Sequence, residues 1–446
     1  MSSKTCPKRL ELQSLNSFAV LQENISKKEK RNMKKPKNDG PKKTFKIRLY
    51  PNVAQIVLLY KTFGCCRKLY NTFLSLKQQK QPVPTESVFK SEFPYMKEVD
   101  SIALQQSRLR LQTAYDNFFK SLKGQRKGSK IGPPKFKSKR NEFQSYKSIN
   151  VNENIQINFE SRQIKLPKIG WVKFRDNRIF SARINSVTVS RDPAHRFHAS
   201  ILIDKSVPQN KACPEKVLGF DMSLQHLIVD SSGNKTDYPR YFRKNEDKLA
   251  WEQRKLSRKQ KASHRYQSQK IKVARVHARI ADSRRDFLQK LSTQITNEYD
   301  AVCVESLNMK AMAGSLTLGK SVNDCGWGEF SRMLEYKCLW KGKHFIKVDK
   351  WFPSSKLCSV CGFKNVALTL ADRVWTCPGC GTVQDRDCNA AVNIRDEGIR
   401  ILNLNHNLNS STAGTAGIHA QGDCARPVQV RDNTFCVVES CTGNGR

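Results

Sequence analysis

Four cysteines stand in two pairs in the C-terminal part of the sequence. Two residues separate the members of each pair and fifteen separate the pairs, which are Cys358 with Cys361 and Cys377 with Cys380. This spacing is typical of a zinc ribbon. Four thiolates complete the tetrahedron around Zn²⁺ and leave no open position for water, so we expect a structural zinc ion rather than a catalytic one. The nearby Cys388 is expected to face the core without binding the metal.

Three carboxylates form a second candidate site. Asp221 ends one apolar strand, Glu305 ends another, and Asp387 precedes the start of a helix. If the strands are neighbours and the helix packs across their ends, the three side chains converge. Such like charges raise one another's pKa unless a cation lies between them. Two Mg²⁺ ions about 3.5–4 Å apart would activate a water and stabilise the leaving oxygen of a phosphodiester, which is nuclease chemistry.

Each carboxylate also has an ordinary structural interpretation. An aspartate after a strand is often a turn residue, and Asp385 or Asp387 could simply cap the helix that follows. The pattern alone therefore leaves open whether these acids bind a metal.

The charge balance points to a polyanionic partner. The 446 residues contain 80 Lys and Arg against 39 Asp and Glu, a formal net charge of +41. Cationic side chains on phosphates release condensed counterions, so we expect tight and salt-dependent binding of nucleic acid. A basic surface without a partner is the alternative. No apolar run is long enough to cross a bilayer, and no signal-peptide segment is evident, so a soluble intracellular protein is expected. The 15 cysteines, an odd number, argue against a disulfide scaffold.

The two ends of the chain lack a sustained apolar period. Residues 1–43 are rich in lysine and predict a disordered basic arm, which could bind phosphates, act as a nuclear address or be a solvated tail. Residues 401–446 are rich in Asn, Ser, Thr and Gly and predict a disordered tail.

The first half of the chain predicts a β-unit with a helical insertion. Alternation over residues 44–50 indicates a strand, and five short segments within 124–210 alternate in the same way, which predicts an antiparallel barrel or sandwich. The intervening residues 51–123 carry helical periodicity, with one helix from about Ser101 to Leu122.

The second half predicts an α/β unit. Strands are expected at 217–221, 227–230, 301–304 and 345–348, and a helix around 329–341. A long basic helical region covers 240–296 with a break near Ala262. In its second part an apolar stripe lies beneath a Lys/Arg face, formed by Ile271, Ala274, Ala278, Ala281, Leu288, Leu291 and Ile295.

Several strings in this order resemble the transposon-encoded TnpB proteins. They include Gly219-Phe220-Asp221, Glu305-Ser306-Leu307-Asn308, Trp327-Gly328-Glu329-Phe330, Phe352-Pro353-Ser354-Ser355-Lys356 and Asp385-Arg386-Asp387 followed by Asn389-Ala390-Ala391. The similarity spans roughly residues 44–395 and is collinear with the zinc knuckles.

The resemblance implies an RNA-guided DNA endonuclease related to type V CRISPR effectors. The implied fold is α/β plus β: a wedge β-barrel (44–50 and 124–210) with a helical recognition insertion (51–123) precedes an RNase H-like RuvC domain. That domain would comprise 211–352, a zinc ribbon at 353–384 and a final segment at 385–400. Asp221, Glu305 and Asp387 match the family's metal ligands, and the four cysteines match its zinc ligands.

The implied cofactors are two Mg²⁺ ions and one structural Zn²⁺, and the implied partners are a guide RNA and double-stranded target DNA. Base pairing would read the target while the protein recognises a short adjacent motif. Gln105 matches a family position that contacts this motif, although a simple surface amide is the alternative. Basic side chains of the 240–296 helices are expected to hold the backbone of nucleic acid, namely Arg254, Arg258, Lys259, Lys272 and Arg275. We expect a monomer with one RNA, in the cytoplasm or nucleoid, or in the nucleus if the arm is an address.

Three alternatives remain at this point. A nuclease-dead, RNA-guided repressor would need a lost carboxylate, and all three are present. A transposase acting on element ends would work without guide RNA. A non-enzymatic zinc-ribbon protein would tolerate Asn or Gln in place of the acids.

Overall fold

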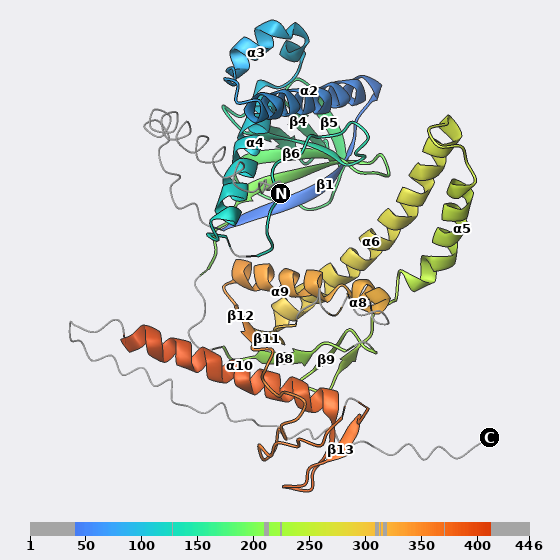
Figure 1. Ribbon diagram of the computed structural model, residues 1–446. Helices are drawn as coiled ribbons and strands as arrows, with labels where there is room; N and C mark the ends of the chain where they lie inside the picture. Colours follow the sequence, from blue (N-terminus) through green and yellow to red (C-terminus); the bar gives the residue numbers. More distant parts are fainter. Residues whose placement is uncertain are drawn as a thin grey trace, which may run out of the picture.

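The computed structural model describes residues 41–411, except positions 127, 209–213, 224, 308–311, 313, 315–318 and 370. Most of the expected arm (1–40) and of the expected tail (412–446) thus lies outside the described residues. The chain forms two lobes, one around each of its larger sheets (Figure 1). None of the helices in the described ranges combines the length and apolar character needed to cross a membrane.

The N-terminal lobe is built on a seven-stranded antiparallel sheet with the order β2-β6-β7-β1-β5-β4-β3. Its strands are β1 (Lys42–Tyr50), β2 (Gln144–Ile149), β3 (Gln156–Asn158), β4 (Gln163–Leu166), β5 (Gly170–Arg175), β6 (Ile184–Arg191) and β7 (Phe197–Asp204). Phe45, Ile47 and Leu49 of β1 are buried in alternation, as expected. The expected arm ends earlier than residue 43, since β1 begins at Lys42.

The expected antiparallel barrel is formed only in part by the described residues. The edge strands β2 and β3 have one ladder partner each and do not pair with each other, so the sheet is an open half-barrel. Strand β3 is only three residues long, and helices pack beside β2, which covers that edge without closing the sheet. Strand β2 was not predicted, because its sequence QSYKSI has few apolar residues, although Tyr146 and Ser148 alternate inward.

The helical insertion consists of α2 (Val53–Gln78), α3 (Glu86–Glu92), the 3₁₀ helix η1 (Pro94–Glu98) and α4 (Ser101–Leu122), which confirms the bounds expected for the last helix. Asn52 caps α2 in a reciprocal pair of hydrogen bonds with Gln55. Asp100 caps α4 by accepting the Ile102 N–H at 3.0 Å, and it also accepts the Ser148 hydroxyl at 2.5 Å. The cap of α4 is therefore tied to β2.

The C-terminal lobe is built on a five-stranded sheet with the order β10-β9-β8-β11-β12. Its strands are β8 (Val217–Asp221), β9 (Ile228–Asp230), β10 (Lys235–Thr236), β11 (Ala301–Glu305) and β12 (His344–Val348). Strand β8 is antiparallel to β9 but parallel to β11, which is parallel to β12. The carboxyl ends of β8, β11 and β12 consequently meet at one edge.

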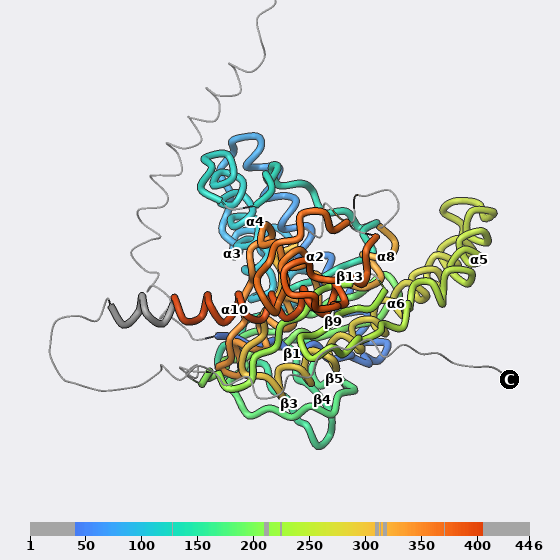
Figure 2. The backbone as a smooth tube through the Cα atoms, turned by 90° about the horizontal axis from the view of Figure 1, so that it is seen from below, coloured from blue at the N-terminus to red at the C-terminus, as the bar shows by residue number. Residues whose placement is uncertain are grey.

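Helices cover both faces of this sheet. On one face lie α6 (His264–Glu298) and α9 (Trp327–Lys341), and on the other lies α10 (Arg386–Ser411), which crosses β8, β11 and β12 (Figures 1 and 2). The remaining elements are the 3₁₀ helix η2 (Arg243–Asn245), α5 (Glu246–Ser257), α8 (Gly319–Cys325), β13 (Val374–Thr376) and β14 (Val383–Asp385). The expected disordered tail from residue 401 is wrong up to Ser411, because α10 continues to that residue and buries Leu402 against the sheet.

The apolar stripe expected in α6 is also partly wrong. In the first part of the helix the buried side chains are Val273, Val276 and Ile280, while Ile271 and Ala274 are only half-buried. The reason is the hairpin that α5 and α6 form (Figure 1). Leu249 of α5 packs against these three residues. The neighbour, not the periodicity, selects the buried face.

Polar contacts join the two lobes. Arg196 Nη1 lies 2.6 Å from Asp282 Oδ2 on α6, and Lys270 Nζ lies 2.6 Å from Glu142 Oε1. Both pairs connect the N-terminal lobe to the long helix of the C-terminal lobe. The hairpin of α5 and α6 is thereby fixed beside the half-barrel.

Candidate functional site

The carboxyl edge of the five-stranded sheet carries the first two expected acids. Asp221 is the last residue of β8, and its Oδ1 accepts the Met222 N–H at 2.8 Å. Glu305 is the last residue of β11. Because Val304 pairs with Phe220 in the parallel ladder, the residues that follow them, Glu305 and Asp221, lie side by side.

The third expected acid comes from α10. Asp387 lies in the first turn of this helix, which packs so closely on β8 that a Cβ on Gly219 would lie 2.5 Å from the Ala391 carbonyl oxygen. Two guanidinium groups flank Asp387, with Arg373 Nη1 at 3.5 Å from Oδ2 and Arg386 Nη2 at 3.4 Å from Oδ1. Glycine at position 219 thus permits the approach that brings Asp387 to the edge of the sheet.

The electrostatics show that the three acids interact. Burial, followed by the charges of Asp387 and Glu305, raises the pKa of Asp221 to about 7. Burial also raises the pKa of Glu305. Neighbouring carboxylates repel one another when they are all ionised. A divalent cation bound between them offsets this repulsion and favours their ionised forms.

Asp385 has a different role from Asp387. Its Oδ1 accepts the backbone N–H groups of Asp387 and Cys388, at 2.9 and 3.0 Å, and its Oδ2 pairs with Lys235 Nζ at 2.8 Å. Burial pushes the pKa of Asp385 up, but the hydrogen bond from Lys235 and those from the backbone outweigh it, so the pKa is lowered. Asp385 is therefore the helix cap, and the capping role does not fall to Asp387, the aspartate that matches the metal ligand of the resembled family.

The four expected zinc ligands come together. The sulfur atoms of Cys358, Cys361, Cys377 and Cys380 all lie within 4.8 Å of one another, and they form the one such group of potential metal ligands in the described part of the chain. Cys358 Sγ is 3.7 Å from Cys380 Sγ, and Cys361 Sγ is 3.6 Å from Cys377 Sγ. Tetrahedral Zn–S bonds of about 2.3 Å separate the sulfurs by about 3.8 Å, so the donors fit Zn²⁺ and are too far apart for disulfides. The three carboxylates do not form an equally tight group.

A groove beside Glu305 was not anticipated from the sequence. Its volume is about 290 Å³, and it opens between the end of β11 and α9, lined by Met222, Glu305, Ser306, Leu307, Gly328, Ser331, Arg332, Glu335 and Lys347. The Trp-Gly-Glu-Phe string marks the start of α9, but only the fold shows that this helix borders the acids. Of the three expected acids, Glu305 is the one that lines this groove.

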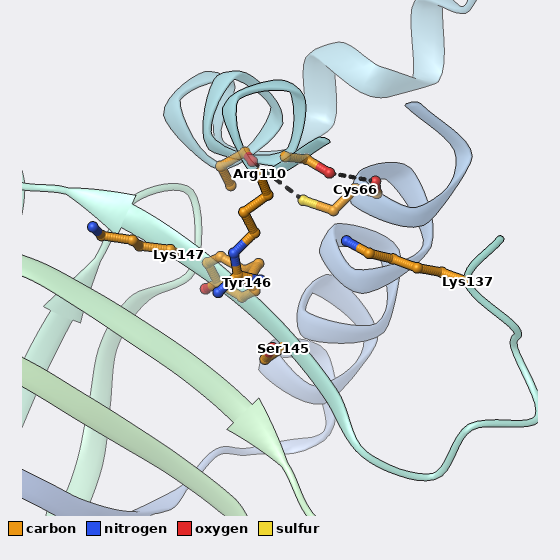
Figure 3. A pocket seen from close by; sticks show the side chains of 8 residues that line it. Cys66, Arg110, Lys137, Ser145, Tyr146 and Lys147 are labelled. Carbon is orange, nitrogen blue, oxygen red and sulfur yellow. Dashed lines mark hydrogen bonds between the residues drawn. The ribbon is translucent and has the colours of Figure 1, made fainter. Parts of the chain in front are cut away.

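A second hollow, in the N-terminal lobe, is too small for a ligand. It has about 10 Å³ between α4 and β2, where Arg110 reaches toward Tyr146 (Figure 3). Lys137 lies beside it, 3.8 Å from the centre of the Tyr70 ring, and burial followed by the charge of Arg110 lowers the pKa of Lys137 to about 8. A space of this size holds one water at most.

The expected nucleic-acid contacts lie on exposed positions, apart from Lys259. Gln105 is exposed on α4, between buried neighbours. Arg254 and Arg258 are exposed at the end of α5, and Lys259, which follows them, is half-buried. On α6, Lys272 and Arg275 are exposed. These basic residues share the α5–α6 hairpin, which projects from the five-stranded sheet alongside the N-terminal lobe (Figure 1).

Family models match three stretches of the chain. A model described as "Probable transposase" matches residues 200–316, one described as "Cas12f1-like, TNB domain" matches 327–394, and one described as "Helix-turn-helix domain" matches 41–80. In this structure the last stretch is not two helices, but the strand β1 followed by the single helix α2.

Curated relatives match most of the chain. A protein of Streptomyces pristinaespiralis named "Putative RNA-guided DNA endonuclease" is 37% identical over 377 residues, which covers 80% of this chain and 90% of that protein. A protein of Escherichia coli K12 with the same description, InsQ, is 29% identical over 386 residues, covering 80% and 92%.

A solved structure of a Cas12f1–sgRNA–target DNA complex has a TM-score of 0.47 and 14% identity to this chain. It covers 80% of this chain and 99% of the solved one.

Proposed function

The chain belongs to the TnpB family of RNA-guided DNA endonucleases encoded by transposable elements, and from this premise we propose that it hydrolyses DNA at guide-matched targets with Asp221, Glu305 and Asp387 as its catalytic carboxylates. The family membership rests on the 37% identity to the Streptomyces protein over 80% of the chain. In this proposal the half-barrel is the wedge unit, α2 to α4 form the recognition insertion, and the C-terminal lobe is the RuvC-like nuclease.

The observation that carries the proposal is the convergence of three acids from separate stretches of chain. Asp221 and Glu305 end parallel neighbouring strands, and α10 brings Asp387 so close that its charge raises the pKa of Asp221. Isolated turn or cap residues would not raise one another's pKa, and the capping role at this helix belongs to Asp385. The arrangement supports a Mg²⁺ site at the edge of the sheet.

The residues around the proposed Mg²⁺ site would have distinct roles in hydrolysis. Bound Mg²⁺ supplies the activation of water and the stabilisation of the leaving oxygen in phosphodiester hydrolysis. Asp221, Glu305 and Asp387 would hold the cations, while Asp385 keeps Asp387 at the start of its helix. The groove beside Glu305, with Arg332 and Lys347 in its lining, would admit the strand to be cut.

The guide RNA and target DNA would occupy the cationic surface. Arg254, Arg258, Lys259, Lys272 and Arg275 would hold phosphates along the α5–α6 hairpin, in keeping with the formal charge of +41. Gln105, exposed on α4, would read a base edge of the short motif beside the target. One chain would act with one RNA, in the compartment where the element's DNA resides.

The test is purification of the full chain with the RNA that accompanies it, RNA sequencing, and cleavage of a plasmid library in Mg²⁺. We expect a defined RNA and cutting of matched targets beside one short motif. Asp221→Asn is expected to abolish cutting while RNA binding persists. Asp396→Asn, which removes an exposed carboxylate farther along α10, is the matched control and is expected to cut like the wild type. Undiminished cutting by Asp221→Asn would refute the assignment of the site.

A second candidate function, a transposase that joins element ends, is favoured by the description of the matching family model. The two functions differ in their need for RNA. A transposase would process the ends of the element without guide RNA, whereas the proposed endonuclease is inert toward any DNA that its guide does not match.

A further inference from the structure

The first turns of α10 present two opposite faces, and each is fastened to a different part of the lobe. One face lies on the sheet, where Gly219 accepts the close approach of Ala391 and Arg395, and Gly398 meets Cys303. Asp387 stands one helical turn before Ala391, so it projects on this same side, toward the edge of the sheet.

The opposite face of α10 is fastened to the zinc module, which is the segment 353–384 that carries the four clustered cysteines. Asn389 donates from Nδ2 to the Leu357 carbonyl at 2.7 Å, and its Oδ1 accepts the Ser359 N–H at 2.8 Å. Asn393, one turn later, donates from Nδ2 to the carbonyls of Ser354 and Leu357, both at 2.8 Å. Both amides are buried, with 3% and 8% of their surface exposed.

A third buried amide bonds a zinc ligand itself. Gln384 of β14 donates from Nε2 to Cys358 Sγ at 2.9 Å, and it directly precedes Asp385, the cap of α10. Hydrogen bonds to metal-bound groups orient them and depend on them in turn. The segment from Gln384 to Asn393 therefore contacts the first zinc knuckle both before and after Asp387.

We propose that Gln384, Asn389 and Asn393 are positioning residues that make the zinc module the support of Asp387, so that the bound zinc sets the affinity of the carboxylate site for Mg²⁺. This inference rests on the proposed nuclease function. Without zinc the knuckle at 354–361 loses the ion that closes it, and its carbonyls cease to be fixed partners for the two asparagines. A buried amide without a hydrogen-bond partner is destabilising, so the first turns of α10 open to solvent. Asp387 then moves away from the edge of the sheet where Asp221 and Glu305 lie.

Asn389 acts through this contact and not as a metal ligand, because both polar atoms of its side chain already bond the knuckle backbone. The zinc ion itself takes no part in catalysis, because its four thiolate ligands leave no position for water or substrate. The zinc module is thus a structural support whose effect is measured at the other metal site.

The experiment compares Asn389→Ala and Asn393→Ala with the wild type, as RNA-bound full-length chains. The control is Asn365→Ala, which removes an amide of the zinc module whose oxygen accepts the N–H of the nearby Ala367. Zinc content, target binding and the rate of target cleavage across a Mg²⁺ titration are measured. We expect unchanged zinc and target binding, and a half-maximal Mg²⁺ concentration raised about three- to tenfold, below the roughly 10–100-fold seen for direct outer-shell partners. Saturating Mg²⁺ is expected to restore the rate, and the control to match the wild type.

If the wild type cuts its target and both asparagine variants need the same Mg²⁺ concentration as the wild type, the inference is overturned. Amide hydrogen exchange gives a readout that does not need cleavage or correct folding of a variant. When a chelator removes zinc from the wild type, amides of 385–391 are expected to exchange faster while those of β8 and β11 stay protected. Equal protection of 385–391 with and without zinc overturns the inference. A wild type that cuts no guided target in Mg²⁺ refutes the proposed function instead, and the exchange result still decides whether zinc supports this turn.

Discussion

The charge of Asp221 should destabilise the protein when no divalent cation is bound, and Asp221→Asn should relieve this. The raised pKa, about 7 against an ordinary 3.8, is a difference of about three pH units and corresponds to about 4 kcal/mol of unfolding free energy. An acid whose pKa is raised by folding stabilises the fold when it is protonated. This stabilisation is full below the pKa of the unfolded chain, near 4, and is lost as the pH rises through the pKa of the folded chain, about 7. The penalty is therefore complete at pH 8 and about 2 kcal/mol at pH 5.

The assay is thermal unfolding of the RNA-bound chain in buffer without divalent cations, at pH 8 and at pH 5. The variant should melt above the wild type at pH 8, by about 8–16 °C at about 2–4 °C per kcal/mol, and the gap should shrink by more than half at pH 5. Asparagine keeps the oxygen that accepts the Met222 N–H, so the change isolates the charge. Asp396→Asn should show no such pH-dependent gap. A variant that melts at or below the wild type at pH 8, or a gap of equal size at both pH values, would refute the reasoning.

Three further predictions concern packing, zinc and charge. Gly398→Ala should destabilise the chain by about 1–3 kcal/mol in chemical unfolding, because the new methyl would collide with the Sγ and Cβ of Cys303. The added change Cys303→Ala removes the sulfur but keeps Cβ, so it should recover part of the loss, and an equal loss in the double variant would contradict the packing argument. Cys377→Ser should release the zinc, measured as metal content, and expose the zinc module to protease, whereas full zinc retention would show that the four thiolates do not form the site. Replacing Arg254 and Lys272 together by Ala should weaken binding of RNA of any sequence and reduce the slope of log affinity against log salt by about 2, and an unchanged slope would place the RNA elsewhere.

Local sequence patterns were sufficient to predict the four-cysteine cluster and most strands and helices. The spacing of the four cysteines determines their chemistry because a CxxC pair closes a knuckle from neighbouring residues, and the structure brings the four sulfurs together. The helix over 101–122 and the strands that end at Asp221 and Glu305 were predicted for the same reason, since their periodicity is a local property.

Contacts between distant segments decided the features that the patterns missed. Strand β2 is too polar to be recognised alone, but it pairs with β6 and receives the cap of α4 through Ser148. The buried side of α6 follows from α5 packing against Val273, and the length of α10 follows from the sheet that buries Leu402.

The carboxylate site shows the division most clearly. The sequence by itself determined which acids end strands or begin a helix, because those positions depend on short-range periodicity. Only the tertiary structure decided that they meet: the parallel ladder sets Glu305 beside Asp221, and Gly219 admits α10 closely enough to bring Asp387 to them. It also decided that Asp385 caps and Asp387 does not, since a carboxylate's role depends on which N–H groups and charges surround it in space.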